Sequence, residues 1–204
     1  MTVAQGSHRK TRRSTTGQIV VISGPSGVGK STICRELIQR LDKAYLTVSA
    51  TTRARAATEV EGKDYWFISK EEFLRRIKQG AFLEYAEVFG NYYGTPRDQV
   101  EQALGQGKAV ILEIDVQGGK QAKQVYPDAT MIFIVAPDGQ ALQGRLAGRG
   151  REDAAAMQRR LAKAEQETQA ARGHYDWFVV NDDLERAIGQ IVEIIAGDKR
   201  RLSA

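Results

Sequence analysis

Short apolar runs alternate along this chain with longer amphipathic segments. Gln18–Ser23, Ala109–Asp115 and Thr130–Val135 are continuous runs rich in β-branched residues, which are typical of strands buried on both faces of a sheet. Ser31–Leu41 and Asp183–Ala196 carry apolar residues at helical spacing, so each predicts an amphipathic helix. Strands that alternate with helices in this way predict an α/β fold with a parallel central sheet.

Two stretches interrupt this alternation. A short strand pattern at residues 45–49 leads into residues 48–98, which combine a further short strand pattern at 65–69 with glycine-rich turns. Residues 140–170 hold most of a long helix with polar faces. We therefore expect two inserted lobes, named here the first inserted lobe (48–98) and the second inserted lobe (140–170). The expected core then consists of residues 18–47, 99–139 and 171–204, with a last strand at 176–180.

Polar residues mark where three of the helices should begin. Ser69 and Glu72 have the spacing of a capping box, with the helix starting directly after Ser69. Thr95 followed by Pro96 predicts an N-cap and a first helical position. Asp138 predicts the cap of a third helix, which would open the second inserted lobe.

Composition and charge exclude several classes of protein. The chain is 42% apolar and has no run near the ~18 apolar residues that a membrane-spanning helix needs. One cysteine, Cys34, excludes an internal disulfide and a cysteine-rich metal site. The start of the chain lacks the pattern of a secretory signal, so we expect a cytoplasmic protein without a membrane partner. The sequence leaves the oligomeric state open.

The net charge of +5 belongs mainly to the start of the chain. Residues 1–17 carry four Lys or Arg residues, no acidic residue and no hydrophobic periodicity, and therefore predict a disordered basic tail. Contact between this tail and nucleic acid is a weaker alternative, because four charges make a small electrostatic footprint.

The chemistry of the chain centres on residues 24–31, which fit the phosphate-loop pattern G-x-x-x-x-G-K-[ST]. A predicted strand precedes them and a predicted helix follows, which is the context that the motif requires. Glycines let several backbone N–H groups point at one anion, and the helix start adds a positive dipole end. Lys30 can reach the outer phosphates of a nucleoside triphosphate, and the Ser31 hydroxyl can hold Mg²⁺.

Arginines indicate which kind of nucleotide enzyme this is. Arg53 and Arg55 lie in the first inserted lobe, and Arg145, Arg149 and Arg160 in the second. A triphosphate and a monophosphate together carry about six negative charges, so bringing them into contact requires cationic side chains of this number. The pattern favours phosphoryl transfer between two nucleotides.

Acidic residues give a second indication. Glu84 follows an apolar pair, and Glu113 and Asp115 end a buried strand, where a carboxylate is costly without donors or a metal. One carboxylate can accept both the N1–H and the exocyclic amino group of guanine, a donor pair that adenine lacks. Asp115 could instead hold Mg²⁺ through water, and Glu113 could form an ion pair in the core.

Eight sequence pieces give this chain a resemblance to bacterial guanylate kinases, from Gly17 to about Ala196. In order, they are Gly24–Ser31, Ser49–Arg53, Glu61–Tyr65, Phe82–Glu84, Gly90–Thr95, Leu112–Gly118, Gly148–Gly150 and Val180–Asp183. The resemblance implies a P-loop NTPase-type core with an inserted GMP-binding lobe and a lid, which close over ATP and GMP with Mg²⁺. It implies the transfer of the γ-phosphoryl group of ATP to GMP. A guanylate-kinase-like module that binds a protein ligand is the alternative.

The same resemblance implies the roles of individual residues. The ATP site would comprise Gly24, Pro25, Ser26, Gly27, Val28, Gly29, Lys30, Ser31, Thr32 and Asn181. The guanine would contact Ser49, Glu84 and Thr95 with Asp115 nearby, and the GMP phosphate would contact Arg53, Tyr65 and Tyr93. Lys30, Arg53, Arg145, Arg149 and Arg160 would be catalytic, and Ser31 and Asp115 would hold the metal.

One departure from the family pattern concerns the GMP phosphate. The family usually has a second phosphate arginine three residues after the first, and in this chain that position is Ala56. Arg55 either replaces the missing clamp or leaves GMP binding weaker, so Arg55 is included as a candidate GMP-binding residue.

Overall fold

The structure is a computed structural model that describes residues 17–88, 90–147 and 154–197. Its centre is a five-stranded sheet in which every neighbouring pair is parallel and the strand order is β2-β7-β1-β8-β9. The strands are β1 (Gln18–Ser23), β2 (Ala44–Leu46), β7 (Ala109–Glu113), β8 (Thr130–Val135) and β9 (Trp177–Val180). The expected parallel α/β fold is therefore confirmed.

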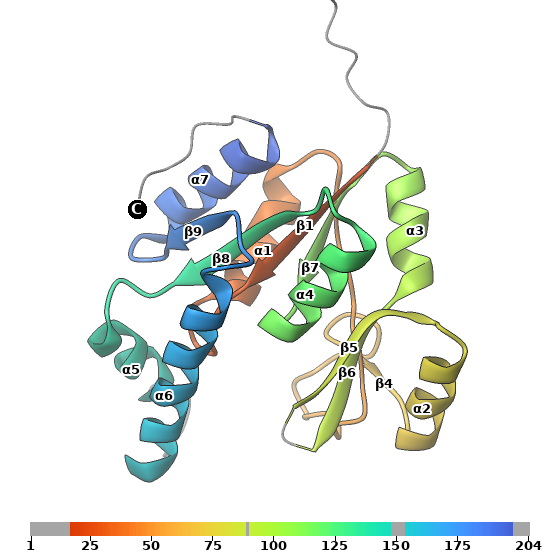
Figure 1. The fold of residues 1–204 in the computed structure, drawn as a ribbon, viewed down its shortest axis with the longest axis horizontal. Helices are drawn as coiled ribbons and strands as arrows, with labels where there is room; N and C mark the ends of the chain where they lie inside the picture. The colour runs from red at the N-terminus through yellow and green to blue at the C-terminus, as the bar shows by residue number, and fades with distance from the viewer. Residues whose placement is uncertain (1–16, 89, 148–153, 198–204) are drawn as a thin grey trace, which may run out of the picture.

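Helices cover both faces of this sheet (Figure 1). Val20 and Ile22 of β1 pack in the same core as α1 (Lys30–Arg40) and α7 (Leu184–Ile195). Ile19 and Val21 face the opposite core, which includes α3 (Arg97–Gly105) and α4 (Val116–Val125). Because side chains of a strand alternate between faces, one apolar run serves both cores.

Helix α4 has no counterpart among the sequence-based expectations. Its sequence, VQGGKQAKQV, contains two adjacent glycines and few apolar residues, so it shows little helical periodicity. The carboxylate of Asp115 accepts a hydrogen bond from the Gly118 N–H at 2.8 Å and caps the helix. The two glycines allow a close approach of neighbouring groups, which becomes important for the site.

A second, smaller sheet of four strands lies wholly within residues 50–96 and packs beside the core (Figure 1). Its strand order is β4-β3-β6-β5, and α2 packs on it through a small core that includes Ala50, Phe73 and Phe82. The elements are β3 (Ala50–Thr51), β4 (Trp66–Phe67), α2 (Lys70–Lys78), β5 (Phe82–Val88) and β6 (Asn91–Pro96).

The structure departs from two of the three expected helix starts, those of α2 and α3. Ser69 caps α2 by accepting the N–H of Glu72, as expected, but the Glu72 carboxylate binds Arg75 and Arg76 instead of completing the capping box. Thr95 is not the N-cap of α3, because Pro96 occupies that position without a side-chain cap. The Thr95 hydroxyl is engaged elsewhere, as described below.

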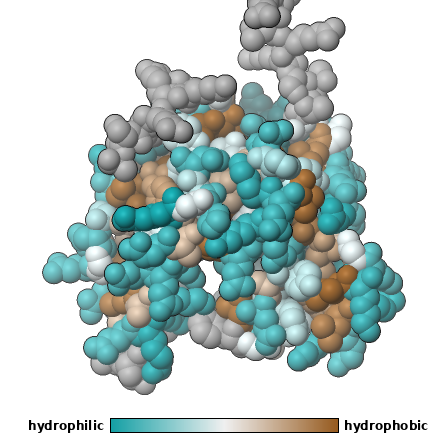
Figure 2. Space-filling model, in the orientation of Figure 1, coloured by the Kyte–Doolittle hydropathy of each residue, from teal (hydrophilic) through white to brown (hydrophobic). Residues whose placement is uncertain are grey.

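Helices α5 (Gly139–Ala147) and α6 (Ala154–Ala171) extend from the same side of the core as the small sheet (Figure 1). Asp138 caps α5 as expected, since its carboxylate accepts the Ala141 N–H at 2.7 Å. The face in Figure 2 is mostly hydrophilic and hollowed between α6 and the lobe that carries the small sheet. Within the described residues, no helix combines the length and apolar character that crossing a membrane requires.

Candidate active site

The loop between β1 and α1 forms a backbone cradle at the end of the central sheet. Gly27 and Gly29 have φ values of +86° and +101°, which other residues rarely adopt. A Cβ on Gly24 would lie 2.4 Å from the Ile134 carbonyl oxygen, and one on Gly29 would lie 2.6 Å from Nδ2 of Asn181. No side chain caps the start of α1, so its first N–H groups and its dipole can serve an anion.

Lys30 and Ser31 begin α1 beside this cradle. The Lys30 ammonium donates to the carbonyl oxygens of Gly24 at 2.6 Å and Pro25 at 2.9 Å, which holds the loop closed. The Ser31 hydroxyl donates to Oε1 of Glu113 at 2.6 Å. Glu113 ends β7, which pairs with β1, so the sheet itself brings this carboxylate to the first turn of α1.

The two strand-end acids therefore have different surroundings. The sequence made Asp115 a candidate for the metal and for the guanine site, and offered a core ion pair as one possibility for Glu113. In the structure Glu113 contacts Ser31, whereas Asp115 caps α4. The pairing of β1 with β7 could have indicated this contact, because parallel pairing places Ile22 opposite Glu113 and so brings Glu113 to the start of α1. The role of Asp115 toward metal and guanine stays a prediction.

Asn181 and Arg145 support the phosphate loop from outside. Asn181 is buried and donates from Nδ2 to the Val28 carbonyl oxygen at 2.7 Å. The guanidinium of Arg145, on α5, donates to the carbonyl oxygens of Val28 at 3.2 Å and Asn181 at 2.7 Å. The structure thus brings Arg145 and Asn181 to the loop, while Arg160 is exposed on α6. Arg149 lies outside the described residues.

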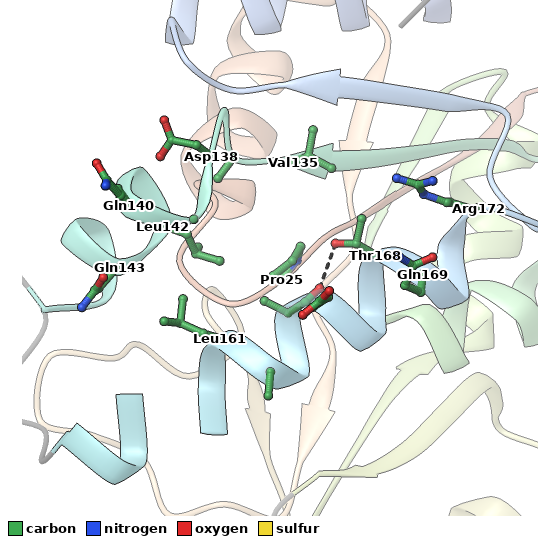
Figure 3. Close-up of a pocket in the computed structure, with 15 residues that line it drawn as sticks. Pro25, Val135, Asp138, Gln140, Leu142, Gln143, Leu161, Thr168, Gln169 and Arg172 are labelled. Atoms are coloured by element: carbon green, nitrogen blue, oxygen red, sulfur yellow. Dashed lines mark hydrogen bonds between the residues drawn. The ribbon is translucent and has the colours of Figure 1, made fainter. Parts of the chain in front are cut away.

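The remaining expected ATP-binding residues lie in the loop or in the first turn of α1. Ser26 and Thr32 are exposed, and Val28 is buried beneath the turn. Pro25 also lines a cavity of about 990 Å³ that separates the loop and the end of β8 from α5 and α6. Figure 3 shows Leu142 of α5, Leu161 of α6 and Pro25 of the loop around this space.

Glu84 and Thr95 form a buried pair on neighbouring strands of the small sheet. The side chain of Glu84 is 4% exposed, and its Oε1 accepts hydrogen bonds from the Thr95 hydroxyl at 2.6 Å and the Thr95 N–H at 3.0 Å. Its Oε2 lies against α4, where a Cβ on Gly118 would approach it to 2.4 Å. Thr95 is therefore committed to holding this carboxyl, which explains why it does not cap α3.

The ionisation of Glu84 is unusual for an acid. Burial raises the pKa of Glu84 to about 7, and the negative charge of Asp115 contributes to the rise. The two hydrogen bonds from Thr95 act in the opposite direction without cancelling the effect of burial. The site therefore favours a ligand that brings additional donors to this carboxylate. Ser49, the third expected guanine contact, is half-buried just before β3.

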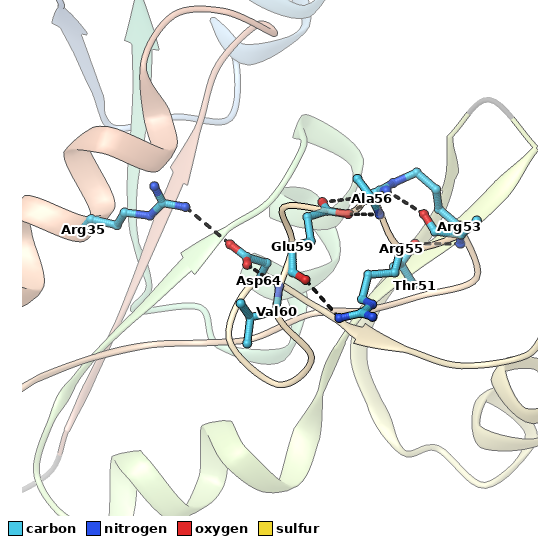
Figure 4. A network of polar contacts seen from close by, with 9 residues as sticks. Arg35, Thr51, Arg53, Arg55, Ala56, Glu59, Val60 and Asp64 are labelled. Carbon is cyan, nitrogen blue, oxygen red and sulfur yellow. Dashed lines mark hydrogen bonds and ion pairs between the residues drawn. The ribbon is translucent and has the colours of Figure 1, made fainter.

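Arg53 lies in a polar network of the first inserted lobe (Figure 4). Its guanidinium binds Glu59 through two contacts of 2.6 and 3.0 Å, and hydrogen bonding to Glu59 raises the pKa of Arg53. The guanidinium carbon also lies 5.5 Å from the centre of the Tyr65 ring, which meets Tyr93 edge to face at 5.9 Å. Arg53, Tyr65 and Tyr93 are thus brought together, and Glu59 is a partner that sequence reasoning missed.

Arg55 is exposed and donates to the backbone carbonyl oxygen of Glu59 at 3.2 Å. It occupies the same loop as Arg53 but does not share the Glu59 carboxylate. A further ion pair in Figure 4 joins Arg35 of α1 to Asp64 at 3.5 Å, and so connects the core with the first inserted lobe.

Comparison with known proteins agrees with the motifs and the fold. The family model described as guanylate kinase matches residues 16–198. A guanylate kinase of Synechocystis sp. is 48% identical over 186 residues, which cover 91% of this chain and 97% of the relative. One of Thermosynechococcus vestitus is 52% identical over 172 residues, which cover 84% and 90%.

A solved structure gives the same result in three dimensions. The crystal structure of guanylate kinase from Anaplasma phagocytophilum matches with a TM-score of 0.74 at 33% identity, and the match covers 92% of this chain and 89% of that chain. The family model spans all of the described residues, including the phosphate loop and the Glu84–Thr95 pair. The chain belongs to the guanylate kinase family.

Proposed function

We propose that this protein transfers the γ-phosphoryl group of ATP to GMP, with ADP and GDP as products. The observation that carries the proposal is the buried carboxyl of Glu84, whose pKa of about 7 reflects burial without enough donors. The N1–H and amino group of guanine would supply two donors and favour the ionised form. Adenine has no such donor pair, so a purine site built around Glu84 would select GMP over AMP.

The residues near the phosphate loop suit Mg²⁺ as the partner of ATP. Mg²⁺ prefers oxygen ligands, retains several waters and binds few protein side chains when phosphates are present. The Ser31 hydroxyl and the Glu113 carboxylate, 2.6 Å apart at the start of α1, are such a donor set. The ion would neutralise charge on the β- and γ-phosphates. Within the described residues, no cluster of three acidic, His or Cys side chains competes for it.

The chain's own residues would act by positioning and by charge. Backbone N–H groups of the loop and the ammonium of Lys30 would hold the triphosphate, and Lys30 would exchange its two carbonyl partners for phosphate oxygens. Arg53 would hold the GMP phosphate with Tyr65 and Tyr93 beside it. The phosphate oxygen of GMP is already anionic, so the reaction needs no strong general base.

Movement of α5 and α6 would exclude water and bring further positive charge. Arg145 already contacts the loop, and the cavity beside Pro25 leaves these helices room to move. Arg149 and Arg160 are proposed to join the transferring group in the closed form. The protein-binding alternative is less favoured, because the intact phosphate loop with Lys30 would serve no purpose in a passive scaffold. Location in the cytoplasm stays a prediction.

A panel of nucleoside monophosphates tests this proposal. Release of ADP from Mg·ATP would be followed in a coupled assay with GMP, AMP, CMP or UMP as acceptor. We expect turnover with GMP and at least a 10²-fold lower kcat/KM with AMP, since the unpaired buried carboxylate penalises adenine. Equal turnover of AMP and GMP would refute the role of Glu84, and absence of turnover with every acceptor would refute the enzyme.

A further inference from the structure

Two buried hydroxyls meet directly beneath the phosphate loop. The Tyr175 hydroxyl donates to Oγ of Ser23 at 2.6 Å, and the Ser23 hydroxyl donates to the carbonyl oxygen of Ile114 at 2.7 Å. Ser23 is fully buried and Tyr175 is 7% exposed. A backbone carbonyl oxygen can only accept a hydrogen bond. Ser23 must therefore donate to Ile114, and Tyr175 must donate to Ser23.

These residues belong to three different parts of the site. Ser23 ends β1 and directly precedes Gly24, the first residue of the phosphate loop. Ile114 leads to α4, whose first turn contacts the Glu84 carboxyl at Gly118. Tyr175 lies just after α6, and its N–H donates to the carbonyl oxygen of Ala171, the last residue of that helix. The junction therefore links the loop, the helix behind Glu84 and the end of the second inserted lobe.

The structure reserves space for the Tyr175 hydroxyl. A Cβ on Gly119 would lie 2.2 Å from the hydroxyl oxygen, so only glycine lets α4 pass this close. The tyrosine ring has a separate packing contact, because its centroid lies 5.4 Å from that of Phe133. Burial raises the pKa of Tyr175 to about 12, which keeps the hydroxyl protonated and able to donate.

We propose that the Tyr175 hydroxyl and the Gly119 backbone form a positioning pair, which fixes the phosphate loop relative to α4 and hence the donor phosphate relative to GMP. This inference rests on the proposed function only for its kinetic consequence. Tyr175 contacts neither nucleotide site directly and acts through Ser23. A small displacement of the loop would leave each nucleotide bound but misalign the two reacting groups.

The first test replaces only the hydroxyl. Tyr175→Phe keeps the ring contact with Phe133 and removes the donor to Ser23. We expect kcat to fall about tenfold while KM for ATP and for GMP changes less than about two-fold, because alignment is lost and ground-state binding is kept. Tyr126→Phe, at the far end of α4, is the matched control and should retain kcat. A Tyr175→Phe enzyme with unchanged kcat and only a lower Tm would overturn the proposal.

The second test uses the space above Gly119. Gly119→Ala alone should lower kcat at least as much as Tyr175→Phe, because the methyl group displaces the hydroxyl. In the double variant the oxygen is gone and the nearest ring carbon would lie 3.2 Å from the new Cβ, a tight but adjustable contact. We expect the kcat of the double variant to lie within about two-fold of Tyr175→Phe alone. Multiplicative losses would show that the two positions act independently and would contradict the pair.

A third measurement does not depend on catalysis. Amide hydrogen exchange of residues 24–30 in the ligand-free protein should accelerate in Tyr175→Phe and not in Tyr126→Phe, since the base of the loop loses a buried hydrogen bond. Unchanged exchange in Tyr175→Phe would refute the positioning role even if the wild-type protein showed no kinase activity. Conversely, a wild-type protein inactive with every acceptor but with faster loop exchange in the variant would refute only the proposed function.

Discussion

The phosphate cradle and the Glu84 pocket are built in opposite ways. The cradle consists mainly of backbone from eight consecutive residues, and its partners Asn181 and Arg145 act by holding backbone carbonyls. The Glu84 pocket consists of side chains from β5 and β6, closed by a glycine of α4. A phosphate of any nucleotide suits the cradle, whereas the pocket sets one carboxylate against the edge of one base.

This difference separates affinity for phosphate from specificity for a base. Backbone N–H groups are fixed in place by the fold and do not titrate. The partial positive charge that the cradle presents to a phosphate is therefore independent of pH. Burial disfavours the ionised form of the Glu84 carboxyl and raises its pKa. A ligand that donates hydrogen bonds to the carboxylate favours the ionised form again. Changes in the cradle should therefore affect every acceptor, and changes in the pocket should affect GMP alone.

The largest expected effect belongs to the cradle. Lys30→Ala removes the ammonium that closes the loop and would neutralise the transferring group. We expect kcat to fall by about 10²- to 10³-fold, since removal of a single stabilising group at the reacting centre lowers kcat by about this factor. Steady-state kinetics with GMP measure this loss, and Lys43→Ala, an exposed lysine after α1, is the control. A Lys30→Ala enzyme with more than a tenth of wild-type kcat would refute the assignment.

The pocket should show a smaller and more selective effect. Glu84→Ala leaves the guanine donors without their acceptor, and we expect kcat/KM for GMP to fall about 10²-fold. Binding of Mg·ATP, measured by calorimetry, should change less than two-fold, because Glu84 lies on the small sheet and not at the cradle. Glu87→Ala removes an exposed carboxylate from the same strand and should leave both constants unchanged. Equal losses for ATP and GMP would erase the distinction between the two regions.

The sequence predicted the cradle better than the pocket for a physical reason. Residues 24–31 are contiguous, so strand, glycines, Lys30 and Ser31 could be read together. Thr95 beside Pro96 has the local pattern of a helix cap, and this pattern led to the wrong prediction. The hydrogen bond of Thr95 to Glu84, eleven positions earlier, cannot be recognised from neighbouring residues.

Partners distant in sequence explain the other errors as well. The sequence did not predict helix α4, because its two glycines add no apolar residues at helical spacing. They instead allow Glu84 and Tyr175 to approach the helix closely. For Glu113 the sequence offered only a possible ion pair in the core, whereas the pairing of β1 with β7 places its carboxylate beside the Ser31 hydroxyl. Glu59 could be paired with Arg53 only once the loop between β3 and β4 was folded.

The pH dependence sharpens the comparison further. Only ionised Glu84 accepts from guanine, so kcat/KM for GMP should fall as pH drops below about 7, approaching tenfold per unit. Glu84→Gln should lose this component, while any titration of the GMP phosphate persists and serves as an internal control. Binding of Mg·ATP alone should not follow the same titration. A wild-type profile identical to that of Glu84→Gln would contradict the raised pKa.

Stability should change with pH in the opposite sense to binding. The folded-state pKa of Glu84 lies near 7, above its ordinary value of 4.5, so folding favours the neutral form. This contribution is fully present below about pH 4.5 and is lost as pH rises to about 7, by up to ~3 kcal/mol. Relative to Glu84→Gln, the ligand-free wild type should therefore lose stability across this window, as measured by urea unfolding. A constant difference between the two proteins would contradict this account.

The smallest expected effect belongs to Arg55, which is compared with Arg53 of the same lobe. Arg53 is partly buried and ordered by Glu59 and the Tyr65 ring, so Arg53→Ala should raise KM for GMP more than tenfold. Arg55 is exposed and donates to the backbone carbonyl of Glu59, and solvent screening limits the contribution of such a group to about 0.2–1 kcal/mol. Arg55→Ala should therefore raise KM for GMP about two- to four-fold. Ala56→Arg, which restores the arginine that the family usually has, should lower it. If Arg55→Ala matched Arg53→Ala, Arg55 would be a full second phosphate clamp, and the lobe would have replaced the missing arginine by moving its neighbour inward.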